Sequence, residues 1–314
     1  MAHFKSFFRS YGLFFSITLG CFCPFLHEFS ELYFAYLLMP MLFFVFVRIH
    51  APIHALHWSH ALLLLWNFGF PCLAFLFVRA LGSSTEFAMA AFLCAVTPTG
   101  TAAPVVMTFL EGRMEYVVLA FLLTTLSFTF GIPFLFPFFY GVETPGLSMV
   151  ILQKVSGVVL LPMFLAIICR LVYPQSQDWG RKAQDFSFLL WQCLIILICS
   201  QMSHSVMVNR EVLYAIPPSF LIALSICILN FTAGHFLGGK RFGRECSQSL
   251  GQKNCSLTIL VALLYATPTI ALGPSLYIMC HNTWNAIQIA RHEKSKKRLE
   301  KERPEKEHTE TMGS

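Results

Sequence analysis

Long apolar runs separated by short polar segments dominate the chain. Several runs hold no charged residue over about 20 positions, the length of helix that spans the hydrocarbon core of a bilayer. The pattern predicts an all-α polytopic membrane protein with ten transmembrane helices, the fourth and ninth of which are broken. The predicted segments are 11–27, 33–48, 60–80, 86–110 (broken), 115–140, 148–172, 184–203, 212–237, 246–267 (broken) and 273–290.

Composition supports this class. Apolar residues make up 56% of the chain, charged residues only 12%, and the mean hydropathy is +0.64. A soluble domain carries about a quarter charged residues. Many of the charges lie in 291–314, which holds eight Lys/Arg and six Glu. We therefore expect a ten-helix domain over 1–290 and a charged tail over 291–314.

The positions of the basic residues predict the orientation of the chain. With the N-terminus in the cytoplasm, eighteen of the 22 Lys and Arg residues fall on the cytoplasmic side and three on the other side, while Lys253 lies within a predicted segment. Cytoplasmic loops are enriched in Lys and Arg. We therefore expect both termini in the cytoplasm. The compact loops are typical of a bacterial inner (plasma) membrane protein.

The two broken segments occupy corresponding positions in two halves of five segments each. The halves, about 11–140 and 148–290, must lie in opposite orientations, as inverted repeats. The breaks fall at 97–104, with two prolines and a glycine, and at 249–254. Non-helical backbone at membrane depth is tolerated only where protein buries it or where it lines a watery cavity. Paired breaks of this kind mark the binding site of a secondary transporter.

The residues around both breaks resemble the bile acid:sodium symporter family. The run from Pro98 to Val106, followed by Glu111-Gly112-Arg113, is similar to the family's fourth-helix crossover. The run Gly251-Gln252-Lys253-Asn254 is similar to the ninth-helix crossover. The resemblance spans roughly residues 10 to 290. It implies a core domain that contains both crossed helices, a panel domain that moves against it, organic-anion substrates and sodium coupling.

The resemblance also implies a substrate site beside the crossing. By position, Thr101 and Asn254 would face the substrate. The other residues assigned to this site are Pro98, Gly100, Gly251, His281 and Asn282. A hydrogen bond between helices explains the polar pair at 281 and 282 as well as a substrate does.

The sodium ligands of the family do not carry over to this chain. Ala103 and Pro104 stand where the family usually has Ser-Asn, and Ser249 stands where it has an acidic residue. Lys253 replaces a Gln, and Asn67 lies near the position of an amide in the third helix. No carboxylate falls deep within a predicted segment. We therefore expect no ordinary sodium coupling.

Lys253 is the only basic residue predicted at membrane depth. A Lys near the bilayer centre costs roughly 2.5–3.5 kcal/mol on insertion scales, which makes it a functional candidate. One hypothesis is that its ammonium replaces the missing sodium, donating to carbonyls and to Ser249, Asn254 or Asn67. In a variant, Lys253 contacts an anionic substrate, or it loses its proton and couples transport to pH. The alternative, without a functional role, is that the Lys253 side chain extends until its ammonium reaches the membrane interface.

The sequence thus predicts a carrier of a small amphipathic organic anion that works by alternating access, and not an enzyme. One alternative is a protein with a transport fold that acts as a sensor or binding protein. An intramembrane enzyme is disfavoured because intramembrane acids and metal-ligand spacings are lacking. We expect no cofactor, no metal and no nucleic-acid partner. The histidines at 50, 54, 57 and 60 have no Cys or carboxylate partner and are interpreted as interfacial residues.

Overall fold

The computed structural model describes residues 12, 15–49, 52–142, 144–176, 178–179 and 183–302. These residues form helices and one isolated β-bridge. The predicted positions at Lys5, Arg9, Arg181, Lys182 and 303–314 lie outside them. The elements are η1 (Pro24–Phe29), α2 (Ser30–Arg48), η2 (Ile53–Ala55), α3 (Ser59–Ala80), α4 (Thr85–Val96), α5 (Ala103–Phe109), α6 (Met114–Tyr140), α7 (Leu147–Val172), η3 (Pro174–Ser176), α9 (Gln184–Val208), α10 (Glu211–Gly251), α11 (Cys255–Tyr265) and α12 (Pro268–Glu302).

Five of these helices are long and apolar enough to cross a membrane. They are Ser59–Ala80, Met114–Tyr140, Leu147–Val172, Phe186–Val208 and Glu211–Gly251. Three shorter apolar helices lie at Tyr36–Arg48, Thr85–Val96 and Cys255–Tyr265. The fold therefore agrees with an integral membrane protein built from helices.

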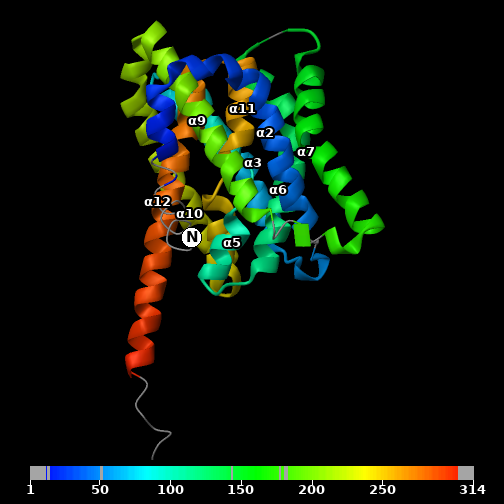
Figure 1. The fold of residues 1–314 in the computed structure, drawn as a ribbon. Helices are drawn as coiled ribbons and strands as arrows, with labels where there is room; N and C mark the ends of the chain where they lie inside the picture. The colour runs from blue at the N-terminus through cyan, green and yellow to red at the C-terminus, as the bar shows by residue number, and fades with distance from the viewer. Residues whose placement is uncertain are drawn as a thin grey trace, which may run out of the picture.

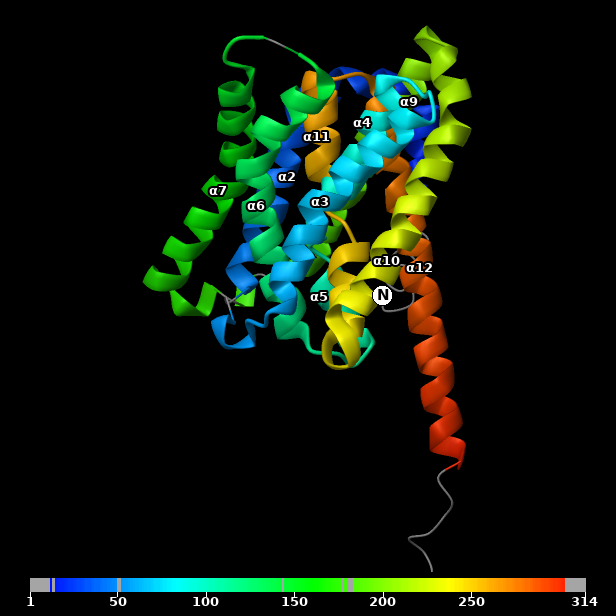
Figure 2. The ribbon, with the colours of Figure 1, turned by 180° about the vertical axis from the view of Figure 1, so that it is seen from behind.

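The helices pack as two groups. In the first, α2 packs against α7 and α9; in the second, α4 and α10 pack against each other and against both α3 and α12, and α5, α6 and α11 join them. The main packing between the groups is that of α6 against α7. Both views show α12 leaving one end of the bundle and continuing well beyond it as a single helix (Figures 1 and 2). The helix runs without interruption past residue 290, where we expected the tail to begin.

The long element α10 is two helices joined by a tight turn. Gly239 (φ 61°, ψ −160°) and Phe242 (φ −130°, ψ 18°) lie outside the helical region. A positive φ at this ψ is accessible essentially only to glycine, so Gly239 fixes the turn. The turn explains why a helix of 41 residues separates into the eighth predicted segment and the first part of the ninth.

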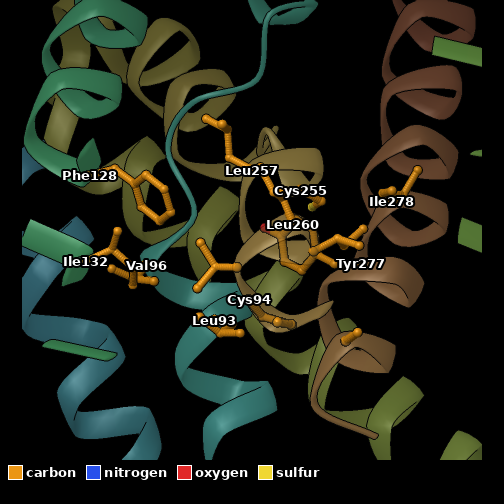
Figure 3. Close-up of a cluster of buried hydrophobic side chains, with 14 of the residues drawn as sticks. Leu93, Cys94, Val96, Phe128, Ile132, Cys255, Leu257, Leu260, Tyr277 and Ile278 are labelled. Atoms are coloured by element: carbon orange, nitrogen blue, oxygen red, sulfur yellow. The ribbon is translucent and has the colours of Figure 1, made fainter. Parts of the chain in front are cut away.

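The largest apolar core lies where α4 ends and α11 begins. Figure 3 shows side chains from α4, α6, α11 and α12 gathered at this place. Phe128, Ile132 and Val96 are fully buried, and Tyr277 is fully buried beside them. This core holds the ends of the broken helices in fixed positions.

Both breaks are shorter than the sequence indicated. The first covers 97–102, because Pro104 lies in the first turn of α5, where a proline without an N–H is well tolerated. The second covers only 252–254, because Ser249, Leu250 and Gly251 complete α10. The expectation that Pro104 and Ser249 belong to unwound backbone is therefore wrong.

Candidate functional site

The two unwound segments cross and hydrogen-bond to each other. The Gly100 N–H donates to the Gln252 carbonyl at 2.6 Å, and the Asn254 N–H donates to the Pro98 carbonyl at 2.8 Å. Thr99 and Lys253 form an antiparallel bridge between them. Each break thus satisfies backbone groups that the other exposes, which is what non-helical backbone at membrane depth requires.

Gly100 permits this close approach. A Cβ at this position would lie 3.1 Å from the Lys253 carbonyl oxygen and 3.2 Å from the Gln252 carbonyl oxygen. Both atoms belong to the backbone and cannot move aside cheaply. A side chain at position 100 would therefore require the second break to shift by a few tenths of an ångström.

Threonine hydroxyls reinforce the crossing. The Thr99 Oγ1 donates to the Ser249 carbonyl at 2.8 Å, and the Thr99 N–H donates to Thr124 Oγ1 at 3.0 Å. The hydroxyls of Thr97 and Thr258 lie 2.9 Å apart. All five residues are buried, so these hydrogen bonds replace those that water would supply.

A second set of linked side-chain hydrogen bonds supports the end of α10. The Tyr277 hydroxyl donates to the Gly251 carbonyl at 2.9 Å and accepts from Asn230 Nδ2 at 3.3 Å. The Trp66 indole N–H donates to Asn230 Oδ1 at 3.0 Å. These hydrogen bonds connect α3, α10 and α12, and they end on Gly251, the last helical residue before the second break.

Lys253 is buried, with 3% of its surface exposed. Its Nζ donates to Asn67 Oδ1 at 2.6 Å and to the Ala95 carbonyl at 3.1 Å, while Asn67 Nδ2 donates to the Val96 carbonyl at 3.1 Å. Ala95 and Val96 end α4, so their carbonyls have no partner within the helix. The C-terminal end of a helix carries partial negative charge, which favours a cation there. Lys253 therefore caps the broken helix of the other half.

A cavity of about 620 Å³ opens beside the crossing. It lies against both unwound segments and is closed by side chains of α2, α9 and α12, including Phe44, Trp191 and Ile278. Seven of the residues singled out from the sequence line it: Gly100, Thr101, Pro104, Lys253, Asn254, His281 and Asn282.

The other residues singled out from the sequence do not line this cavity. Pro98 and Gly251 contribute carbonyls to the hydrogen bonds described above. Asn67 holds Lys253, and the Ser249 hydroxyl donates to the Glu245 carbonyl at 2.8 Å. Ala103 is fully buried at the start of α5. Among the described residues, Lys253 Nζ donates no hydrogen bond to Ser249 or Asn254; it donates to Asn67 and to the Ala95 carbonyl instead.

Three side-chain nitrogens of the cavity wall lack a hydrogen-bond partner in the described part of the chain. They are Asn254 Nδ2, His281 Nδ1 and Asn282 Nδ2. Asn254 and His281 are only 5% and 4% exposed. Buried polar groups are almost always paired, so groups of a cavity wall without a partner in the protein are available to hydrogen-bond to water or a ligand. The arrangement suits a ligand with acceptor oxygens at one end and an apolar body.

Four residues of the cavity wall were not predicted from the sequence. Arg48, Glu115 and Trp191 line the cavity, as does Gln252 within the second break. Gln252 stands inside a motif that was already singled out, so the signal was present. The other three lie at the end of α2, at the start of α6 and within α9, and no local sequence signal directs them toward the cavity.

The described residues hold no group of three or more His, Cys, Asp or Glu side chains that could bind a metal ion. Comparison of the sequence with protein-family models finds no match, and comparison with curated proteins finds none of significant similarity. The resemblance to the bile acid:sodium symporter family therefore stays a prediction that rests on the motifs alone.

Proposed function

We propose that this protein is a secondary transporter of a small amphipathic organic anion that works by alternating access without sodium coupling. The observation that carries the proposal is the pair of interrupted helices that cross beside a cavity. Interrupted helices in transporters expose backbone groups to substrate and ions at the bilayer midplane. The cavity volume of about 620 Å³ lies in the range of small-molecule sites.

The proposed membrane topology has ten spans in two inverted repeats, about 11–140 and 148–290, with both termini in the cytoplasm. The positions of α4 with α5 and of the end of α10 with α11, one pair in each half, support it. The packing of α2, α7 and α9 as one group supports a panel that is separate from the core. The cavity lies between this group and the crossing, where alternating access needs it.

The charge of the substrate follows from the wall of the cavity. On the α2 side of the cavity, Arg48 supplies a positive charge. The unpaired side-chain nitrogens of Asn254 and Asn282 are hydrogen-bond donors, and that of His281 is a donor in one tautomer. Phe44 and Trp191 supply apolar surface in the same cavity. Such a wall favours a ligand with a carboxylate or sulfonate head and an apolar body.

In this proposal Lys253 takes the place of a coupling cation. Its ammonium is held by an amide oxygen and a helix-end carbonyl, the kinds of ligand that also bind sodium. A tethered cation cannot be exchanged with solution. The crossing is then held together at all times, and transport does not depend on a sodium gradient.

The test is uptake of labelled amphipathic carboxylates and sulfonates into proteoliposomes, alongside binding to the detergent-solubilised protein. A transporter accumulates at least one of these compounds in the vesicle lumen, whereas empty liposomes do not. Binding without uptake would favour a sensor or binding protein that uses the same fold. If none of the tested compounds is bound or taken up, the proposal is contradicted.

A further inference from the structure

A second cavity, of about 350 Å³, lies at the end of the bundle from which α12 extends. It is lined by η2 and the residues that follow it, by the start of α6 and by the turn within α10. Figures 1 and 2 place these three segments at that same end. The lining residues are His54, Ala55, Leu56, His57, Arg113, Glu115, Tyr116, Arg241 and Phe242.

Two arginines converge on one aromatic ring in this cavity. The Cζ of Arg113 lies 5.0 Å from the centre of the Phe242 ring, and the Cζ of Arg241 lies 5.1 Å from it. Among the residues that the structure describes, no hydrogen bond and no ion pair involves either guanidinium group. Both side chains are exposed, and an exposed cation–π contact is weak, so both guanidinium groups stay available to bind an anion.

Buried contacts hold the Phe242 ring and the backbone at Arg113 in place. Phe242 is 7% exposed and stacks on Tyr116 with ring centres 4.8 Å apart. The buried carboxylate of Glu245 accepts the Arg113 backbone N–H at 3.0 Å, which fixes the chain at that point. The Tyr116 hydroxyl lies 2.8 Å from Ser59 Oγ. The cavity is therefore framed by packed side chains.

The charges that face the cavity are unequal. Two guanidinium groups and two imidazoles line it, against the single carboxylate of Glu115. The Glu245 carboxylate is engaged with the Arg113 backbone. Guanidinium groups bind phosphate through paired, charge-assisted hydrogen bonds. Basic pockets between helices on the cytoplasmic side are also where anionic lipid headgroups bind.

We propose that the cavity between Arg113, Arg241 and His57 binds a phosphate group, carried either by an anionic phospholipid headgroup or by a soluble phosphate. The phosphate oxygens accept hydrogen bonds from both guanidinium groups. The Phe242 ring, which both arginines approach, lines the site. The site shares only His54 and Glu115 with the larger cavity, and the proposal does not depend on transport.

The test is thermal unfolding of the full-length protein in a non-ionic detergent with three additives: phosphatidylglycerol, phosphatidylcholine and inorganic phosphate. Stabilisation by phosphatidylglycerol but not phosphatidylcholine assigns a lipid headgroup. Stabilisation by inorganic phosphate, without a difference between the lipids, assigns a soluble phosphate. Absence of both effects overturns the proposal.

Charge variants make the test specific to the cavity. We expect Arg113→Gln and Arg241→Gln each to weaken phosphate binding about tenfold or more, because each removes charge-assisted hydrogen bonds. Lys294→Gln, on the exposed extension of α12, removes one positive charge at the same end and should leave binding unchanged. Equal loss in Lys294→Gln and Arg241→Gln would show non-specific attraction and overturn the proposal. If a Gln variant does not fold, Arg241→Lys serves instead, since it keeps the charge but loses the paired geometry.

Discussion

The Nζ of Lys253 lies 2.6 Å from Oδ1 of Asn67, and this hydrogen bond joins side chains that are 186 positions apart in the sequence. It connects the second break to α3, while the Ala95 carbonyl connects the same ammonium to the end of α4. One positive charge thus links both halves of the chain at the crossing. Its removal should affect the crossing more than the loss of any single neutral hydrogen bond.

A double-mutant cycle measures this link. Asn67→Leu leaves the buried ammonium with one described acceptor, and Lys253→Met leaves the Asn67 and Ala95 oxygens without this donor. We expect each single change to lower stability by about 1–3 kcal/mol, the cost of an unsatisfied buried polar group. The double variant should lose less than the sum of the two, because neither partner is then left unpaired. Additive losses in reversible unfolding experiments would contradict a direct interaction.

At Gly251, the end of α10 packs directly against the Phe231 ring. A Cβ there would lie 2.3 Å from two ring carbons, so Gly251→Ala forces the ring or the helix to move. We expect a loss of about 1–3 kcal/mol from overpacking. Gly157→Ala in α7 is the matched control, because a Cβ there meets nothing within 4 Å. That change should be neutral or stabilising, since alanine favours helix over glycine. Equal melting temperatures for the two variants would exclude a tight contact at Gly251.

Asn254 offers an unpaired Nδ2 to the large cavity. Asn254→Leu keeps the approximate volume but removes the donor, and we expect the KM for the transported anion to rise about tenfold, with a smaller change in kcat. Thr108→Val is the control, because the Thr108 hydroxyl bonds only to carbonyls of its own helix among the described residues. An unchanged KM in Asn254→Leu would remove this residue from the substrate site.

The connection between α5 and α6 is tied to the extension of α12 by a pH-dependent contact. Lys296 Nζ lies 2.5 Å from Glu111 Oε1, and this ammonium, together with His292 at 3.6 Å, lowers the pKa of the Glu111 carboxyl from its usual 4.5. A lowered pKa in the folded state means that the contact stabilises above pH 4.5 and is lost as the pH falls through the lower, folded pKa. Because Glu111 is exposed, we expect only a local effect, namely release of the α12 extension.

Spin labels at exposed positions near 111 and 296 would report that release as a distance distribution that broadens as the pH falls through the lowered pKa of Glu111. The Glu111→Gln variant should show the broad distribution at every pH. A narrow distribution in that variant at neutral pH would show that other contacts position α12.

Much of this architecture follows from local sequence. Pro98 and Gly100 stop the helix after Val96 because one lacks an N–H and the other tolerates close backbone approach. Prolines and glycines are local signals, so the first break was predictable, and Gly251 marks the end of α10 just before the second break. The extent of the two breaks was not predictable, since Pro104 is compatible with the first turn of a helix and Ser249 continues one in its packed surroundings.

The partners of Lys253 were only partly predictable. The sequence shows that a buried cation needs acceptors, and Asn67 is an amide at similar depth in a neighbouring segment. The choice of Asn67 over Ser249 or Asn254 depends on how α3 and α4 pack, which no local pattern encodes. Likewise, Arg48 and Trp191 reach the cavity through the packing of α2 and α9, and the Phe242 site depends on the turn at Gly239.

Sodium dependence of transport tests the central claim most directly. Initial uptake rates of the best anion should be compared in sodium and in choline medium, for the unmodified protein and for Lys253→Met. If Lys253 is a tethered cation, we expect equal rates in both media for the unmodified protein and loss of uptake in Lys253→Met. Uptake that requires sodium, or full uptake by Lys253→Met in choline medium, would contradict the role of Lys253 as a tethered cation.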